Sequence, residues 1–315
     1  MLKIENLSKT YRLGAFGNKE LHAVSNVSFE IQDSQVVSLI GESGSGKSTI
    51  GKMILRLINI SNGSIIFNGQ DVSKLGGASL KEYYRNVQGV FQDPFSSFNP
   101  IFKADRVFGL LHEEFFPHVS DSDWKTKVNN ALESVGLNPQ IVLNKFPHQL
   151  SGGQLQRLLI ARALLLDIKF LVADEIISML DASTRIDVLN LLADLKNSGL
   201  SLLFITHDLS LGYYISDQSI ILYKGHIVER GSTLKIYNNP LHPYTKMLMA
   251  SVPRLDRKWE GIRDTFRGKP LENTKGCIYF ERCPLANNSW DCANNQPQMV
   301  EKEEDHLVAC CCYQQ

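Results

Sequence analysis

Gly41-Glu42-Ser43-Gly44-Ser45-Gly46-Lys47-Ser48 is the stretch that decides the fold. It matches the pattern G-x-x-x-x-G-K-[ST], which is typical of a loop that binds phosphate groups. An apolar run, residues 36–40, precedes this loop and predicts a buried strand. Apolar side chains at helical spacing follow the loop and predict a helix that reaches Ile58: Ile50, Met53, Ile54, Leu57 and Ile58. A strand, a glycine-rich loop and a helix in this order predict a nucleotide-binding α/β domain, because backbone N–H groups at the helix N-terminus can hold phosphate oxygens.

In the phosphate loop (residues 41–48), the backbone and the side chains have different predicted roles. Glycines let the backbone bend around the phosphates, while side chains supply charge and a metal ligand. Lys47 is predicted to reach the β- and γ-phosphates of ATP, and Ser48 to ligate Mg²⁺. The remaining predicted nucleotide contacts around this loop are Gly41, Ser43, Gly44, Gly46 and Thr49.

A second motif lies about 100 residues further on, at Leu150-Ser151-Gly152-Gly153-Gln154. It precedes an apolar helical pattern and therefore offers backbone donors and a hydroxyl at another helix start. Alone, it would fit an ordinary loop and helix cap equally well. Together with the phosphate loop it resembles the signature motif of the ABC ATPases, in which Ser151, Gly152, Gly153 and Gln154 would contact nucleotide.

The resemblance extends to the catalytic motifs in the expected order. The apolar run 170–173 ends in Asp174 and Glu175, which resemble the Walker B carboxylates: Asp174 would hold Mg²⁺ through water, and Glu175 would act as general base on the attacking water. His207, after another apolar run, matches the switch histidine that contacts the γ-phosphate. Gln92 matches the glutamine that senses the metal and the water, and is a predicted metal contact alongside Ser48 and Asp174.

Two further matches and one departure complete the comparison with this family. Asp181 matches the D-loop aspartate, and Tyr11 matches the aromatic residue that stacks on adenine. Ile176 stands where the family commonly has proline after the acidic pair. That proline shapes a turn and does no chemistry, so the sequence still predicts a competent ATPase.

The resemblance to the ABC ATPases, together with the alternation of strand and helix patterns, implies the architecture. We expect an α/β fold of the ABC-type P-loop NTPase class, with a mainly parallel sheet, an antiparallel β subdomain, an inserted helical subdomain at about 93–167 and a small cysteine-rich C-terminal element. The predicted domains are a nucleotide-binding domain over 1–240 and an extension over 241–315. A single phosphate loop and a single signature predict that the chain is half of an ATPase pair.

The overall composition limits the kinds of partner and the cellular location that we expect. Among 315 residues, 33 basic and 33 acidic side chains give zero net charge, which argues against a nucleic-acid partner. No apolar stretch is long enough to span a membrane, and the start lacks the apolar core of a signal peptide. The expected location is the cytoplasmic face of the cell membrane, as a peripheral subunit.

The C-terminal part resembles one subgroup of ABC importers. Asn239-Pro240-Leu241-His242-Pro243-Tyr244-Thr245 is similar to a motif of the oligopeptide, dipeptide and nickel group, and the cysteine-rich tail matches the same group. All six cysteines fall in the last 39 residues. The resemblance implies a [4Fe–4S] cluster on Cys277, Cys283, Cys292 and Cys310; zinc and unliganded thiols are the alternatives.

The predicted function is that of the ATP-hydrolysing subunit of an ABC importer for oligopeptides or dipeptides. Short oligosaccharides or nickel are alternative substrates, and a soluble ABC ATPase of DNA repair or translation is the alternative from another class. The implied partners are a second ABC ATPase subunit forming a heterodimer, two membrane permease subunits, and an extracytoplasmic substrate-binding protein. Phe95, Phe98 and Phe102 are expected either to line a groove for a permease helix or to pack in the core.

Overall fold

The structure is a computed structural model that describes residues 1–13, 19–251, 276–286 and 292–314. Its centre is a mixed sheet of eight strands in the order β11-β12-β10-β9-β3-β8-β7-β6. Five neighbouring strands run parallel: β9 (Gln218–Tyr223), β3 (Val36–Ile40), β8 (Ser201–Thr206), β7 (Phe170–Asp174) and β6 (Val87–Val90). Every residue of β3, β7 and β8 is buried, because helices or the second sheet cover both faces.

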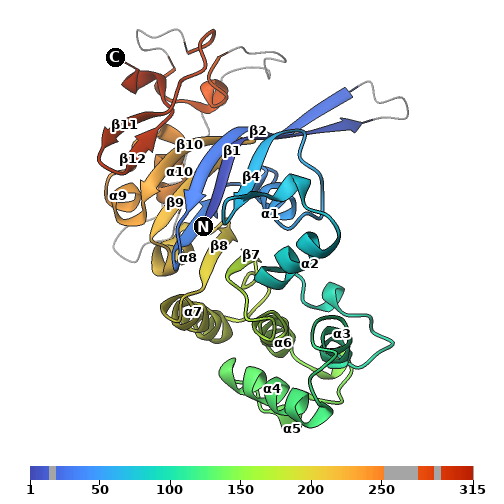
Figure 1. Cartoon of the computed structure of the whole chain (residues 1–315). Coiled ribbons are helices and arrows are strands. Elements are labelled where there is room, and N and C mark those ends of the chain that lie inside the picture. The colour runs from blue at the N-terminus through green and yellow to red at the C-terminus, as the bar shows by residue number, and fades with distance from the viewer. Residues whose placement is uncertain (14–18, 252–275, 287–291, 315) are drawn as a thin grey trace.

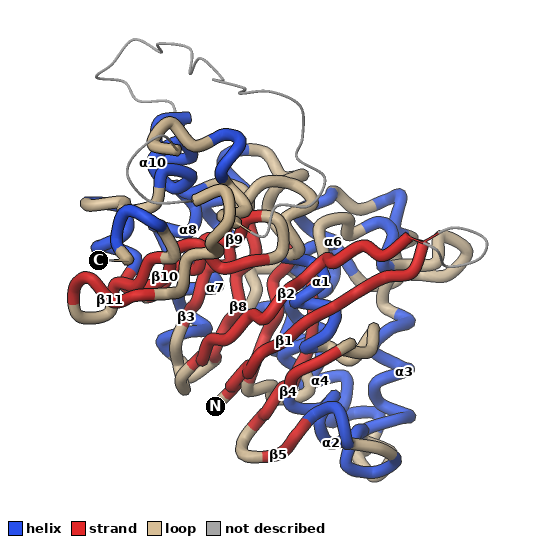
Figure 2. The backbone as a smooth tube through the Cα atoms, turned by 90° about the horizontal axis from the view of Figure 1, so that it is seen from above, coloured by secondary structure: helices blue, strands red, loops and turns tan. Residues whose placement is uncertain are grey.

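A second sheet is antiparallel, in the order β2-β1-β4-β5. Its strands are β1 (Leu2–Leu13), β2 (Lys19–Ile31), β4 (Asn62–Phe67) and β5 (Gln70–Asp71), and Figure 2 shows β1, β2 and β4 side by side. Helix α1 (Lys47–Ile54) packs its buried residues Ile50 and Met53 in one core with Leu2 and Ile4 of this sheet. The phosphate loop before α1 is therefore fixed between two sheets.

The predicted inserted segment is largely helical. It contains α3 (Arg106–Phe115), α4 (Asp121–Ser134), α5 (Pro139–Val142) and α6 (Gly152–Leu164), and α3 to α5 lie at the end of the molecule opposite β11 and β12 (Figure 1). Trp124, Val128 and Leu132 of α4 pack against Leu155 and Leu158 of α6 in a second core. Further helices are α2 (Gly77–Asn86), α7 (Ala182–Asn197), α8 (Leu209–Ile215), α9 (Thr233–Asn238) and α10 (Pro243–Ser251). Short 3₁₀ helices lie at Val72–Lys74, Phe95–Ser97, Pro147–Gln149, Phe280–Arg282 and Cys311–Tyr313.

The chain beyond residue 240 continues the main sheet. β12 (His306–Val308) pairs antiparallel with β10 (His226–Ser232), and β11 (Val300–Glu303) pairs with β12. Residues 252–275 of the predicted extension lie outside the described residues. No helix among the described residues is long and apolar enough to cross a membrane.

The predicted fold class is confirmed in its mainly parallel sheet, its antiparallel sheet and its helical segment. One expectation is wrong: the apolar pattern after the phosphate loop runs to Ile58, but α1 ends at Ile54. The chain leaves the helix because Arg56 adopts a left-handed conformation, with φ 55°.

Candidate active site

One cavity of about 790 Å³ collects most of the predicted nucleotide and catalytic residues. The predicted residues that line it are Tyr11, Ser43, Gly44, Gly46, Lys47, Ser48, Thr49, Gln92, Glu175 and His207. They come from β1, the phosphate loop, α1 and the segments that follow β6, β7 and β8. The carboxyl ends of parallel strands meet at the same edge of the sheet, which explains why residues so distant in sequence share one cavity.

The glycines at both ends of the phosphate loop are required by close packing. A Cβ on Gly41 would lie 2.2 Å from the carbonyl oxygen of Leu222 in β9. Gly46 has φ 104°, and a Cβ there would lie 2.5 Å from the carbonyl oxygen of Ala23. Other residue types would force the loop away from the strands that hold it.

Lys47 lies inside the loop. Its Nζ donates to the carbonyl oxygen of Gly41 at 2.8 Å and to that of Glu42 at 2.9 Å. Burial lowers the pKa of Lys47, and the nearby carboxylates of Glu175 and Asp174 oppose that shift. A cation held this way is placed to meet an incoming phosphate.

Ser48 and Asp174 provide the oxygen atoms that a magnesium ion needs. Ser48 Oγ donates to Asp174 Oδ1 at 3.1 Å, and Asp174 is buried at the end of β7. Burial raises the pKa of Asp174, with the hydrogen bond from Ser48 acting against that shift. A hydroxyl beside a buried carboxylate, with the amide of Gln92 in the same cavity, fits the hard-oxygen preference of Mg²⁺.

Glu175 and His207 face each other across the ends of β7 and β8. His207 Nδ1 lies 3.4 Å from Glu175 Oε2, and the side chains are 58% and 19% exposed for His207 and Glu175 respectively. Glu175 adopts φ 51°, and its backbone N–H donates to the carbonyl oxygen of Ile205. The backbone of Glu175 is thus held at the end of β7, and its side chain lines the cavity, where a carboxylate can serve as a proton acceptor.

The signature residues lie apart from this cavity. Ser151, Gly153 and Gln154 line a different cavity of about 310 Å³, together with Arg157 and Thr184. Ser151 caps α6, its Oγ accepting from the N–H of Gln154 at 3.2 Å. Gly152, the first residue of α6, lies outside the lining of both cavities. A single chain therefore does not bring the signature to its own phosphate loop.

Comparisons with known proteins agree with this geometry. Residues 24–178 match the "ABC transporter" family, and residues 228–292 match "Oligopeptide/dipeptide transporter, C-terminal region". The oligopeptide transport ATP-binding protein AppF of Bacillus subtilis is 37% identical over 99% of this chain and 97% of its own length. The oligopeptide transport ATP-binding protein OppF of Haemophilus influenzae is 38% identical over 92% of this chain and 88% of its own.

The chain belongs to the ATP-binding subunits of the oligopeptide/dipeptide ABC transporters. It is an ABC ATPase, which uses ATP with Mg²⁺. A solved ATP-binding cassette, MJ0796, described as a dimer in a post-hydrolysis state with ADP and Pi, superposes with a TM-score of 0.67. It is 28% identical and covers 74% of this chain and 99% of its own length.

Two family features have local explanations in this ABC subunit. Asp181 caps α7, accepting from the N–H of Thr184, and hydrogen bonds from Ser183 and Thr184 hold the pKa of Asp181 well below its usual range. Ile176, in place of the common proline, is buried in the core that includes Leu180. Packing of an aliphatic side chain therefore fixes this segment where a proline would restrict the backbone.

The cysteines pack together but do not form a ligand set. Cys277, Cys283 and Cys292 share a cluster with Cys311, whereas Cys310 packs with Leu241 and Val308. Burial raises the pKa of Cys277 to about 11, so its thiol is protonated at neutral pH. Among the described residues, no three His, Cys, Asp or Glu side chains are grouped to hold a metal ion. The thiols as arranged do not fit the predicted [4Fe–4S] centre.

Four residues of the nucleotide cavity were not predicted from the sequence: Leu21, Ala23, Glu42 and Leu248. Glu42 is an unspecified position of the phosphate-loop pattern, so the pattern gives it no role. Leu248 belongs to α10, 200 residues after the last residue of the loop, and no local signal links the two. The extension therefore contributes directly to the nucleotide cavity of this ABC subunit.

Proposed function

We propose that this chain hydrolyses ATP to drive import of oligopeptides or dipeptides, as a peripheral subunit on the cytoplasmic face of the cell membrane. The observation that carries the proposal is the single cavity that holds the phosphate loop, Gln92, Glu175 and His207. In it, Lys47 and Ser48 hold phosphate and Mg²⁺, and Glu175 takes a proton from the attacking water. Tyr11, which lines the same cavity, is placed to stack on adenine.

We infer that the working site is composite. Ser151 and Gly153 of a partner subunit would complete the phosphate site of this chain, while this chain's signature would complete the partner's site. Support comes from the separation of the two cavities and from the dimeric form of the related cassette. We propose that the partner is a homologous chain in a heterodimer.

The surface beyond Gln92 is proposed to receive a helix of the membrane subunits. Phe95 and Phe102 are 47% and 42% exposed, and Ile101 is 76% exposed, whereas Phe98 packs partly against the core. Apolar side chains left at the surface in one short segment are typical of an interaction site. Two permease subunits and an extracytoplasmic binding protein would complete the importer.

The domain boundary at residue 240 and the cysteine centre also remain proposals. The division into 1–240 and 241–315 follows the separate character of the C-terminal part; the family matches cover residues 24–178 and 228–292, so the second match begins already within β10. A [4Fe–4S] cluster on Cys277, Cys283, Cys292 and Cys310 rests only on the resemblance of the tail to that of the oligopeptide group, because the described residues do not group these thiols as a ligand set, and no step of the mechanism uses it. Iron analysis of anaerobically purified protein tests it: close to four irons per chain supports the cluster, and metal-free protein rejects it.

Transport by the assembled complex tests the main proposal. Vesicles containing the complex should accumulate labelled peptides in an ATP-dependent manner, and Lys47→Ala should abolish this uptake. Uptake of a labelled oligosaccharide or of nickel, without peptide uptake, would refute the proposed peptide substrate but would leave the proposed ATP-driven import intact.

The composite site has its own test. Ser151→Arg should leave ATP binding by the separate chain unchanged and abolish hydrolysis in the assembled complex. If the separate Ser151→Arg chain lost ATP binding as completely as the assembled complex loses hydrolysis, the composite site would be refuted.

A further inference from the structure

Two residues of the C-terminal extension hold the phosphate loop at Glu42. The backbone N–H of Glu42 donates to the hydroxyl of Tyr244 at 2.9 Å. Arg282 Nη1 donates to both carboxylate oxygens of Glu42, at 3.1 and 3.0 Å. These contacts join positions 202 and 240 residues apart in sequence, so the extension directly fixes a residue between Gly41 and Lys47.

A buried aromatic cluster supports both contacts. The ring centroids of Tyr223 and Tyr244 are 4.6 Å apart, and Tyr279 lies 5.1 Å from the first and 5.5 Å from the second. The guanidinium of Arg282 lies 5.9 Å from the ring of Tyr279. Tyr223 ends β9, the strand beside β3. The cluster therefore connects the central sheet, α10 and the cysteine-rich segment under the phosphate loop.

A buried carboxylate fixes the start of the extension. Glu229 is fully buried, and it accepts hydrogen bonds from the backbone N–H groups of Leu241 and His242 and from His306 Nε2, each at 2.8 Å. His242 Nδ1 in turn accepts from the N–H of Tyr244. One line of hydrogen bonds thus runs from β12 through Glu229 and the first turn of α10 to Glu42.

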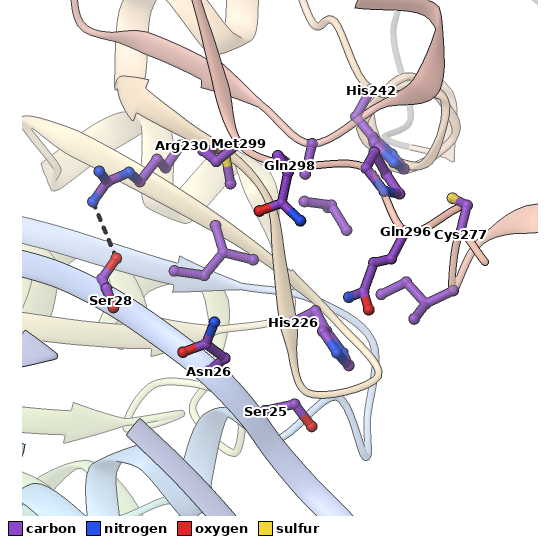
Figure 3. A pocket seen from close by; sticks show the side chains of 15 residues that line it. Ser25, Asn26, Ser28, His226, Arg230, His242, Cys277, Gln296, Gln298 and Met299 are labelled. Carbon is purple, nitrogen blue, oxygen red and sulfur yellow. Dashed lines mark hydrogen bonds between the residues drawn. The ribbon is translucent and has the colours of Figure 1, made fainter. Parts of the chain in front are cut away.

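Apolar packing alone does not fix the joint between the extension and the sheets. A cavity of about 490 Å³ lies there, bordered by Asn26, His226 and Arg230 on one side and by Gln296 and Gln298 on the other (Figure 3). The extension contacts β10 elsewhere, through the pairing with β12 and the apolar core around Val228 and Tyr279, so specific polar contacts add to this packing in placing the extension.

Glu42 has an electrostatic cost for nucleotide binding. It lines the nucleotide cavity, and its side chain is 40% exposed. A carboxylate at this place repels the phosphates that Lys47 attracts. Arg282 lies against the same carboxylate and neutralises it, and the side chain of Arg282 is itself only 23% exposed.

We propose that Arg282 and Tyr244 are positioning residues for the phosphate loop and set its affinity for ATP. Arg282 cancels the charge of Glu42 and holds its side chain away from the phosphates, while Tyr244 fixes the backbone of the loop. The extension therefore takes part in nucleotide binding in its own chain. Neither residue contacts the reacting atoms, so the effect falls on binding and not on the chemical step.

Removing the charge of each member of the pair provides the test. In the full-length chain, Arg282→Gln should weaken ATP binding about three- to tenfold, measured by calorimetric titration, because it leaves Glu42 uncompensated. In the assembled transporter the KM for ATP should rise by the same factor, with kcat within about twofold of wild type. Glu42→Gln introduced into Arg282→Gln should restore most of the affinity, since no carboxylate then remains to be neutralised. Tyr244→Phe should weaken binding by a smaller factor, with Glu42 still paired.

The control is Lys127→Gln, which removes a surface ion pair to Asp167 on the helical part of the chain. It should leave ATP affinity unchanged. Wild-type affinity in Arg282→Gln would overturn the proposal, and so would an equal loss in the double variant, which would show a general structural defect. Should Arg282→Gln not fold, Tyr244→Phe and the double variant decide: wild-type affinity in the first together with weakened binding in the second overturns the proposal.

Discussion

Replacing Glu229 by glutamine should destabilise the whole joint between the extension and the main sheet. Glu229 Oε1 accepts from Leu241 and His306, and Oε2 accepts from His242. A glutamine in the same place keeps one acceptor oxygen, but it turns an NH₂ group toward an N–H group that was 2.8 Å from Oε2. Flipping the amide is worse, because the NH₂ group then faces two donors.

The magnitude follows from these contacts. One hydrogen bond to a buried charge is lost, and a buried N–H is left facing another donor, which together cost about 2–4 kcal/mol. In a chain of this size about 1 kcal/mol changes the melting temperature by roughly 2–3 °C. We therefore expect Glu229→Gln to lower the midpoint by about 4–12 °C in a thermal melt followed by circular dichroism.

The matched control is Glu133→Gln, the same substitution at an exposed glutamate of α4. It should melt within about 1 °C of wild type, as exposed substitutions usually do. A Glu229→Gln midpoint equal to that of the control would refute the reasoning, because it would mean that the three donors around Glu229 find other acceptors at no cost.

Three further outcomes are expected. Glu175→Gln should bind ATP normally in a filter-binding assay and lose about 10²- to 10⁴-fold in kcat, because an amide cannot accept the proton of water; an unchanged kcat would remove Glu175 from the chemistry. Burial lowers the pKa of His242 to about 4, and the charge of Glu229 opposes this shift. His242 should therefore make the free energy of unfolding decrease as the pH is lowered. The unfolded chain binds this proton at pH values below about 6.5, so the stability is present above that value and is lost by roughly 1.4 kcal/mol per unit as the pH falls toward about 4. Urea titrations should show this slope reduced in His242→Asn, and an equal slope would argue against a neutral buried imidazole. Gly41→Ala should abolish measurable ATP binding while the chain stays folded, since the Cβ would lie 2.2 Å from the carbonyl oxygen of Leu222; normal binding would show that the loop can shift.

The strands and the nucleotide cavity were predictable because their signals are local. The runs 36–40, 170–174 and 201–206 are mostly apolar, and each forms a parallel strand of the central sheet. Glu175 and His207 follow their strands directly and Lys47 follows β3 after the phosphate loop, so strand order brings them to one edge of the sheet. The roles given to these residues stay predictions until the variants are measured.

The signature showed both the strength and the limit of this reasoning. The helix start at Ser151 was predicted and is confirmed by its capping hydrogen bond. Its cavity lies apart from the phosphate loop, and nothing in one chain's sequence states which surface another subunit covers. The cysteine spacing predicted even less of the structure. It gave no sign that Cys311 packs with Cys277 while Cys310 packs with Leu241.

The contact between Arg282 and Glu42 could not have been predicted from either segment. Glu42 occupies a position of the loop pattern where any residue is allowed. Arg282 lies in a tail whose only recognisable sequence signal is its cysteines, and that signal says nothing about an arginine. The pair forms because β12 adds to β10, and because Glu229 fixes the first turn of α10 beside the end of β9. Each of these steps is a packing event between distant segments, with no periodicity to reveal it. A function for the extension in ATP binding therefore emerges only from the three-dimensional arrangement, and the Glu42 and Arg282 variants separate that function from simple support of the fold.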